Sequence, residues 1–268
     1  MGKFAGVLLA TDFDDTLYNS RQEVSAENRA ALDYFVREGG FFTVATGRAH
    51  RTFAPHVHLA PVNVPVILSN GALLYDFAQD RAVLEILLDD SAPADIRALC
   101  RAMPTLGVEC YHGDDVYIHN PNEFTHRHVV RVNTTWTPMD LDSMPTPWSK
   151  AVIQDEYPRL LEAQAWLKSR FGDRYEVIFS NPALLECTAK GATKGGMVLR
   201  LADLLGVARK DVYCAGDNQN DIPMLAVSAV PFAPANCAQA VKDWGATVLR
   251  SCDDHCIAQI VEILDGRY

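Results

Sequence analysis

The segment Val7-Leu8-Leu9-Ala10-Thr11-Asp12-Phe13-Asp14-Asp15-Thr16 decides the fold that we expect of this chain. Its apolar half is typical of a buried strand in a parallel sheet, which is covered on both faces. Ligands of open α/β sheets bind beyond the carboxyl ends of the strands, where Asp12 and Asp14 would emerge. Two such close carboxylates repel each other unless a cation or a proton lies between them. By itself the segment fits either a reactive site or a solvated acidic turn.

Three further apolar strands end in polar residues, and the expected helices between them give a βαβ order. If all four strands lie in one parallel sheet, their polar ends converge at one edge. Such an edge offers oxygen ligands for Mg²⁺, donors for an anion and a carboxylate nucleophile. The four strands and their polar ends are residues 7–11 with Asp12, Asp14 and Thr16; 41–45 with Thr46 and Arg48; 64–68 with Ser69 and Asn70; and 211–215 with Asp217, Asn220 and Asp221.

The chain has 268 residues, of which 49% are hydrophobic and 22% are charged, as in ordinary globular proteins. This length predicts one large domain or two smaller ones. A net charge of −10 argues against non-specific binding to nucleic acid or to an anionic membrane. It does not exclude a phosphorylated substrate, because a bound divalent metal inverts the local field. We therefore expect neither a nucleic-acid nor a membrane partner, and the oligomeric state stays open.

The seven cysteines are scattered along the chain and form no CxxC pair. This pattern favours reduced thiols over a disulfide framework or a zinc site. No signal-peptide pattern and no apolar run of membrane-spanning length occurs in the sequence. Together these features predict a cytoplasmic location.

The region from residue 85 to residue 185 differs in texture from the rest, because the βαβ order stops there and short strands alternate with helices. We interpret it as an inserted α+β domain, with residues 1–84 and 186–268 forming the α/β core. Within the insertion we expect helices over residues 92–103 and 159–171, and strands over 107–111, 116–119, 150–154 and 175–179. Its tryptophans are expected to pack in its core.

Four motifs in chain order resemble those of the haloacid dehalogenase (HAD) superfamily of phosphatases. They are Asp12-Phe13-Asp14-Asp15-Thr16, Thr46-Gly47-Arg48, Lys194-Gly195 and Gly216-Asp217-Asn218-Gln219-Asn220-Asp221. The insertion and Ser69-Asn70-Gly71-Ala72 resemble the Cof-type members, subfamily IIB, which carry a C2 cap. The resemblance implies a Rossmann-like core with a parallel sheet and an α+β cap. Two departures are Asp15 and Asp254-His255, where the family commonly has glycine.

The resemblance also implies roles for the core residues. Asp12 would be the nucleophile that forms an aspartyl-phosphate, and Asp14 would be the general acid and base. Thr46 would donate to a phosphoryl oxygen at a turn that opens a helix, and Lys194 would neutralise the charge of the nucleophile and the phosphoryl group.

A magnesium site is implied for the carboxylates of Asp12 and Asp217 with the backbone carbonyl of Asp14. Asn220 and Asp221 are expected to orient the metal and Lys194, although capping of a helix also explains them.

Other polar residues are expected beside the substrate. Gly47 and Thr16 belong to the phosphate-binding turns, and Asn70 is expected next to the phosphoryl group. Arg48 either points toward the substrate or forms a surface salt bridge.

The histidines of the inserted domain have irregular spacing and no nearby cysteine, which favours solvated or packing roles over a zinc site. They are His112, His119, His126 and His128.

The sequence therefore predicts a Mg²⁺-dependent phosphatase that hydrolyses a small phosphorylated metabolite, with sugar phosphates favoured by the resemblance. A phosphotransferase such as a phosphomutase is one alternative. A non-catalytic protein that binds a phosphorylated ligand is the other, although it has no need of the second carboxylate.

Overall fold

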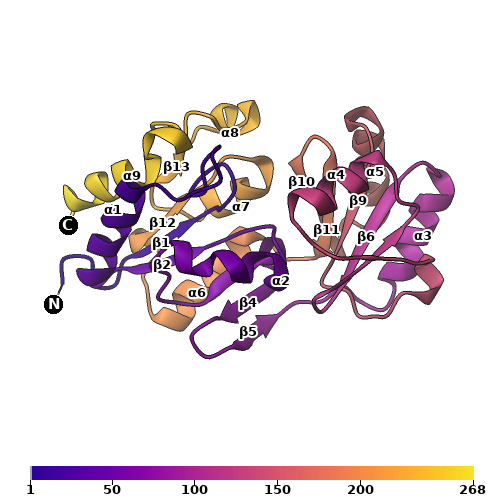
Figure 1. The fold of residues 1–268 in the computed structure, drawn as a ribbon, viewed down its shortest axis with the longest axis horizontal. Coiled ribbons are helices and arrows are strands. Elements are labelled where there is room, and N and C mark those ends of the chain that lie inside the picture. The colour runs from indigo at the N-terminus through magenta and orange to yellow at the C-terminus, as the bar shows by residue number, and fades with distance from the viewer. Residues whose placement is uncertain (1) are drawn as a thin grey trace.

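The computed structural model describes residues 2–268 and shows two bodies joined by two chain crossings (Figure 1). The first body, the core, combines the N-terminal and C-terminal parts of the chain. The second body, the cap, is built from the middle of the chain. This is the predicted α/β core with an inserted α+β domain, and the prediction of the fold class is confirmed.

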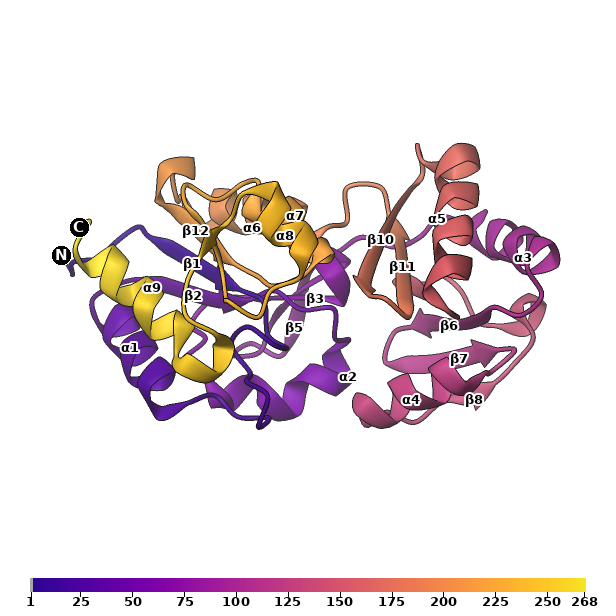
Figure 2. The same ribbon diagram turned by 90° about the horizontal axis from the view of Figure 1, so that it is seen from above.

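The core is organised around a five-stranded parallel sheet in the order β14-β13-β12-β1-β2. Side chains of β1 alternate between its two faces: Leu9 packs with α1 and α9, whereas Leu8 and Ala10 pack with α6. Burial on both faces explains why β1 reads as a continuous apolar run. Figure 2 shows the helices on the two sides of the sheet. The strands of this sheet are β1 (Leu8–Thr11), β2 (Phe41–Val44), β12 (Val212–Ala215), β13 (Pro231–Ala233) and β14 (Thr247–Val248).

The third predicted strand does not belong to this sheet. Val66–Leu68 (β3) pairs antiparallel with β4 (Leu73–Asp76), which pairs with β5 (Arg81–Glu85). It meets β2 only through a single parallel bridge between Ala45 and Ile67. The expectation of four strands in one sheet is therefore wrong for β3, because its hydrogen bonds go to the hairpin that follows it. Its carboxyl end still lies beside that of β2.

The helices of the core follow the predicted order. Helix α1 begins after Ser25, whose hydroxyl accepts a hydrogen bond from the N–H of Asn28 at 3.3 Å, as an N-cap residue does. The α-helices are α1 (Ala26–Arg37), α2 (His50–Phe53), α6 (Lys194–Leu205), α7 (Ile222–Leu225), α8 (Gln239–Trp244) and α9 (Cys256–Asp265). The 3₁₀ segments of the core are η1 (Ala54–Leu59), η2 (Ser69–Gly71), η4 (Arg209–Asp211), η5 (Gln219–Asp221) and η6 (Cys252–Asp254).

The cap is a six-stranded sheet in the order β10-β11-β9-β6-β7-β8 with helices on both faces. Helices α3 and α5 pack on the face away from the core, and α4 lies on the face toward it, where Val129 packs in one cluster with Ala49 of the core. The elements are α3 (Ala92–Ala102), α4 (Glu123–Arg131), α5 (Tyr157–Phe171), η3 (Leu141–Ser143), β6 (Gly107–His112), β7 (Asp115–His119), β8 (Thr137–Pro138), β9 (Lys150–Gln154), β10 (Tyr175–Asn181) and β11 (Leu184–Ala189).

Four cap elements were not predicted: the short β8 and η3, the helix α4 and the strand β11. Helix α4 is short and polar on its exposed side, so its apolar periodicity is weak. Strand β11 pairs with both β9 and β10, and the predicted domain boundary at residue 185 falls inside it. Because all six strands share one sheet, the chain returns to the core after Ala189. No helix within residues 2–268 combines the length and the apolar character that crossing a bilayer requires.

Candidate active site

The polar ends of the core strands converge on a cavity of about 140 Å³ between the core and the cap. Asp12, Asp14 and Asp217 line it from the core, together with the turn that contains Thr46, Gly47 and Arg48. The cap contributes the other wall. Cap residues on this wall are Tyr111, His128, Arg131, Val132, Lys150, Ser180, Asn181, Leu184 and Glu186. The cavity therefore has one wall from the core, which carries the carboxylates, and a second wall from the cap.

Asp12, Lys194 and Asp221 form a continuous buried chain of charges. The Nζ atom of Lys194 lies 2.5 Å from Oδ1 of Asp12 and 2.6 Å from Oδ1 of Asp221, and all three side chains are almost fully buried. Lys194 is the first residue of α6, after the N-cap Thr193. A Cβ atom on Gly195 would lie 2.0 Å from the carbonyl oxygen of Pro223 in α7, so glycine lets α6 pack closely against α7. This close approach brings the Lys194 ammonium group to both carboxylates.

The other oxygen of Asp221 holds the loop that carries Asp217. It accepts hydrogen bonds from the N–H groups of Asp217 at 2.9 Å and Asn218 at 3.0 Å. Asp221 also completes a capping box with Asn218 at η5. Both interpretations of Asp221 are thus compatible: it caps a turn and it contacts Lys194. Because both of its oxygens are used, Asp221 is a poor candidate for a metal ligand.

Three carboxylates of this site lie close enough to share a cation: one oxygen each from Asp12, Asp217 and Asp221 lies within 4.8 Å of the others. Burial, together with the neighbouring carboxylates, raises the pKa of Asp217 to about 7 and holds that of Asp12 well above its usual value. Burial alone would lower the pKa of Lys194, but the two carboxylates beside it outweigh that effect and raise it. One ammonium group does not balance three carboxylates, so the site is short of positive charge.

Asp12 and Asp217 keep oxygens that other protein groups do not occupy. Among residues 2–268, Asp12 uses only Oδ1, toward Lys194, and Asp217 accepts one long bond from the hydroxyl of Thr16 at 3.3 Å. Hard carboxylate oxygens at such spacing fit a divalent cation such as Mg²⁺, which takes one or two carboxylates and keeps several waters.

Arg48 forms a two-pronged ion pair with Asp14 inside the cavity. Its Nε and Nη2 atoms lie 2.9 and 2.7 Å from the two carboxylate oxygens, and its guanidinium group lies over the ring of Phe13. The side chain of Arg48 is only 11% exposed, so the pair is not a surface salt bridge. Burial opposes the charge of Arg48, but the Asp14 carboxylate outweighs it and raises the pKa of the guanidinium group.

Thr46 is buried, and its hydroxyl accepts a hydrogen bond from the N–H of Arg48 at 3.1 Å. The expectation that this turn opens a helix is wrong: α2 begins only at His50, has four residues, and follows an extended Ala49. The turn instead closes on itself through the Thr46 hydroxyl.

Gly47 and Asn70 lie side by side at the edge of the cavity. A Cβ atom on Gly47 would lie 3.2 Å from Nδ2 of Asn70 and 3.3 Å from Oε1 of Glu186, so glycine allows the cap to approach. Asn70 has a left-handed backbone (φ 55°), and its Oδ1 accepts a hydrogen bond from Nδ2 of Asn220 at 3.0 Å. Its own Nδ2 atom is buried without a hydrogen-bond partner within residues 2–268.

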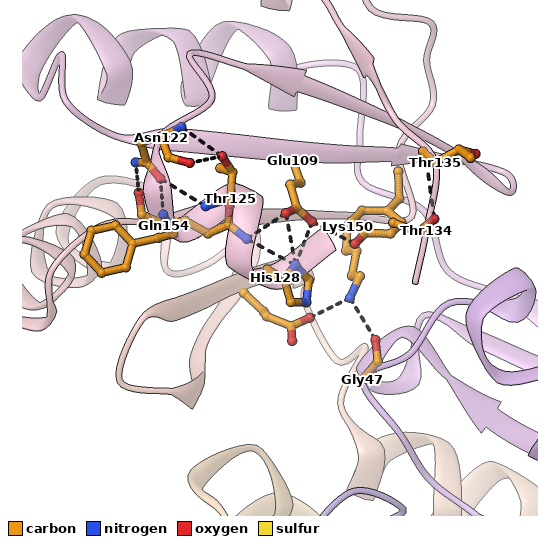
Figure 3. Close-up of polar contacts among 12 residues, drawn as sticks. Gly47, Glu109, Asn122, Thr125, His128, Thr134, Thr135, Lys150 and Gln154 are labelled. Carbon is orange, nitrogen blue, oxygen red and sulfur yellow. Dashed lines mark hydrogen bonds and ion pairs between the residues drawn. The ribbon is translucent and has the colours of Figure 1, made fainter. Parts of the chain in front are cut away.

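The cap reaches the core through Lys150, which sequence reasoning did not single out. Its Nζ atom donates to the carbonyl oxygen of Gly47 at 2.8 Å and to Glu186 at 3.0 Å (Figure 3). A second contact joins Arg131 to Asp15 at 3.3 Å, and both of these side chains are exposed. In the sequence, Lys150 precedes the apolar residues 151–153 and Glu186 follows two leucines, so each looks like an isolated polar residue and no local signal marked it.

Comparisons with known proteins agree with this geometry. Residues 9–261 match the family model described as haloacid dehalogenase-like hydrolase. A 5-amino-6-(5-phospho-D-ribitylamino)uracil phosphatase of Bacillus subtilis is 26% identical, over 97% of this chain and 99% of its own. A pyridoxal phosphate phosphatase of Escherichia coli is also 26% identical, over 95% of this chain and 97% of its own. A haloacid dehalogenase-like hydrolase structure from Bacteroides thetaiotaomicron superimposes with a TM-score of 0.82 at 22% identity, covering 96% of this chain and 99% of that one.

The chain belongs to the haloacid dehalogenase-like hydrolase family, because that family model covers nearly all of it. Within this family it is an enzyme of the phosphatase type, with the Cof-type arrangement of core and cap.

Proposed function

We propose that this protein is a Mg²⁺-dependent phosphatase that hydrolyses a small phosphorylated metabolite through an aspartyl-phosphate on Asp12. The observation that carries the proposal is the buried Asp12 carboxylate at the wall of the cavity, fixed by Lys194 and followed two residues later by Asp14. A binding protein needs a cationic site for phosphate. The cavity has cations in Arg48, Arg131 and Lys150, but it is also lined by the carboxylates of Asp12 and Asp14, which simple binding of phosphate does not need.

In the first step an oxygen of Asp12 attacks phosphorus, and the bond between phosphorus and the ester oxygen breaks. The leaving oxygen takes its proton from Asp14. The Lys194 ammonium group and the polar groups of the turn around Thr46 stabilise the charge on the phosphoryl oxygens. Asp14 is ionised in its ion pair with Arg48. It must therefore leave that pair and take up a proton, from solvent or from a singly ionised phosphate ester, before it can act as the acid.

In the second step Asp14, now ionised, takes a proton from a water molecule, which attacks the phosphorus of the aspartyl-phosphate. The bond between phosphorus and Asp12 breaks, orthophosphate leaves, and both carboxylates return to their starting states. Mg²⁺ bound by Asp12 and Asp217, with the backbone carbonyl of Asp14, would supply positive charge for the phosphoryl oxygens.

The substrate we propose is a phosphate ester of a small polar molecule, with sugar phosphates as the leading class. The cavity is lined largely by polar and charged side chains, and one relative carries a phosphorylated ribityl chain in the name of its substrate. The cap closes the cavity opposite the carboxylates, so we propose that it sets the specificity while the core sets the chemistry.

A phosphotransferase is the alternative within the same chemistry, because the aspartyl-phosphate can also be attacked by a hydroxyl group of a second substrate. Release of free phosphate rather than phosphorylated product separates the two.

The test is release of p-nitrophenol from p-nitrophenyl phosphate with and without Mg²⁺. We expect activity with Mg²⁺, none with excess chelator, and none in Asp12→Asn. Full turnover in excess chelator would contradict the metal dependence, and an active Asp12→Asn protein would contradict the nucleophile.

A further inference from the structure

Glu109 is a buried carboxylate in the cap, and three side chains lie within hydrogen-bond distance of its two oxygens. Glu109 lies in β6 with no exposed surface. It accepts from the Tyr111 hydroxyl at 2.9 Å and from Nε2 of Gln154 at 2.7 Å, and Nδ1 of His128 lies 3.0 Å from both of its oxygens. Burying a carboxylate costs free energy unless hydrogen bonds compensate it, as they do here. The side chains around Glu109 therefore form a specific hydrogen-bonded site.

The pairing fixes how His128 presents its ring. Nε2 of Gln154 also lies 3.2 Å from Nδ1 of His128, but it donates to Glu109 at the shorter distance of 2.7 Å. Because a carboxylate only accepts, the hydrogen between Glu109 and His128 is assigned to Nδ1 of His128. The other ring nitrogen, Nε2, has no hydrogen-bond partner among residues 2–268. Figure 3 shows it turned away from Glu109, toward the side on which Gly47 of the core lies. His128 lines the same cavity as Asp12 and Asp14.

The helix that carries His128 is held firmly against the sheet. Its N-cap Asn122 forms a capping box with Thr125, and Nδ2 of Asn122 donates to the carbonyl oxygen of Gln154 at 2.9 Å. A Cβ atom on Gly107 would lie 2.5 Å from the methyl group of Thr125, so glycine lets the helix pack directly on β6. These contacts set the position of the ring as well as its orientation.

We propose that Nε2 of His128 binds a hydroxyl group on the organic part of the substrate, and that Glu109 is the positioning residue behind it. This inference rests on the proposed function. A hydroxyl group suits the site because it donates to Nε2 of a neutral ring and accepts from Nε2–H of a charged one. The substrate is then a hydroxylated phosphate ester, such as the phosphate of a sugar or a polyol, rather than an apolar one.

The first test locates the hydrogen on the His128 ring by NMR and does not depend on enzymatic activity. In the free protein, long-range ¹H–¹⁵N spectra should show His128 with a hydrogen on Nδ1 at every pH at which the protein is folded. In Glu109→Gln that preference should weaken. A neutral His128 ring with its hydrogen on Nε2 would overturn the proposal.

The second test measures kcat/KM for pairs of esters that differ in hydroxyl groups. The pairs are glycerol 3-phosphate with propyl phosphate, ribose 5-phosphate with 2-deoxyribose 5-phosphate, and glucose 6-phosphate with 2-deoxyglucose 6-phosphate. The wild type should prefer the hydroxylated member of at least one pair by about tenfold, the worth of one well-placed hydrogen bond. His128→Ala should abolish that preference, and Glu109→Gln should reduce it without adding to the effect of His128→Ala in the double variant.

His126→Ala is the matched control, because it removes an exposed imidazole from the same helix and leaves the cavity intact. It should keep the wild-type preference. A wild type that hydrolyses all the esters without any preference would overturn the inference and leave the proposed function standing, as would a preference that survives in His128→Ala. A wild type that hydrolyses none of them, p-nitrophenyl phosphate included, would overturn both.

Discussion

Arg48 donates to both carboxylate oxygens of Asp14, with Nη2 2.7 Å from Oδ1 and Nε 2.9 Å from Oδ2. Asp14 is the proposed acid and base, so its resting partner is a cation rather than water. Such a two-pronged pair fixes the orientation of the carboxylate as well as its charge.

Removal of Arg48 should therefore reduce kcat most for substrates whose leaving group must be protonated. In Arg48→Ala, kcat for an alkyl phosphate should fall by about 10- to 100-fold, which is less than the roughly 10²–10⁴-fold that a positioned acid contributes, because Asp14 itself is still present. The fall should be smaller for p-nitrophenyl phosphate, whose leaving group scarcely needs a proton. Arg48→Lys keeps the positive charge but lacks the planar guanidinium group, so its kcat should lie between those of Arg48→Ala and the wild type. Equal kcat values for Arg48→Ala and the wild type on both substrates would contradict this role.

The affinity for Mg²⁺ should depend on pH. Burial raises the pKa of Asp217 to about 7 in the metal-free protein, and a carboxyl group must lose its proton to bind metal. Between pH 7 and pH 5 the affinity should fall by up to about tenfold per pH unit, and above pH 7 it should level off. Calorimetry in buffers of different ionisation enthalpy measures both the affinity and the released proton. Asp217→Asn should bind Mg²⁺ more weakly and lose the part of this pH dependence that comes from Asp217, whereas the part that comes from the raised pKa of Asp12 should remain.

The raised pKa of Asp217 also predicts how the stability of the metal-free protein changes with pH. The folded state binds a proton on Asp217 up to about pH 7, whereas the unfolded state loses it near the ordinary value of 3.8. This carboxyl group therefore favours folding at low pH, and its contribution is lost as the pH rises from about 4 to about 7. Saturating Mg²⁺ should remove the effect, which denaturant titrations with and without metal can show.

A burst experiment should distinguish the role of Asp12 from that of Asp14. In Asp14→Asn, p-nitrophenol still leaves without a proton, but the water that attacks the aspartyl-phosphate has no base. We expect a burst of about one equivalent of p-nitrophenol, slow turnover, and one added phosphoryl group by mass spectrometry. Asp12→Asn should show no burst. A phosphoryl group that maps to a serine or a histidine would mean that the roles are wrongly assigned.

Lys150 should stabilise the protein mainly by compensating Glu186. Burial opposes ionisation of Glu186, but the Lys150 ammonium group outweighs it and holds the pKa of the carboxyl group below its usual value. Lys150→Met leaves a buried carboxylate uncompensated and should cost about 3–5 kcal/mol of unfolding free energy. The double variant Lys150→Met, Glu186→Gln should cost clearly less, as measured by denaturant unfolding. An equal cost in both variants would show that the loss lies elsewhere, in the contact with Gly47.

Asp15 should tolerate glycine better than alanine. Its backbone is left-handed (φ 61°), a conformation that costs alanine about 1–2 kcal/mol and glycine nearly nothing. Asp15→Ala should therefore be less stable than Asp15→Gly by about 1 kcal/mol, although both lose the exposed contact with Arg131. Equal melting temperatures of the two variants would contradict the argument.

Much of the core could be predicted from the sequence because its signals are local. The apolar run before Asp12 predicted a buried strand that is covered on both faces, which is β1. The two departures from the family pattern, Asp15 and His255, both have left-handed backbones in the structure, with φ angles of 61° and 64°. They occupy turns that glycine usually fills, so the departures change a side chain and not the path of the chain.

The sequence did not predict elements that depend on their partners. The polar end of β2 gave no indication that α2 begins as late as His50, and β11 was missed because its pairing with β9 and β10 joins segments far apart in the chain. Strand β3 was placed in the wrong sheet for the same reason: an apolar run shows burial but not which neighbour takes its hydrogen bonds.

By itself the sequence determined which chemical groups stand at the ends of the buried strands, because strand periodicity and motif order are written along the chain. The tertiary structure alone decided which groups meet. Lys194 contacts Asp12 across 182 residues and Lys150 contacts Gly47 across 103, and such pairs depend on sheet order, helix packing and the approach of the cap. Glu109 and His128 show the difference most clearly. Each looks like an ordinary surface residue of a strand or a helix, and only the packing of α4 on β6 turns them into one buried pair at the cavity.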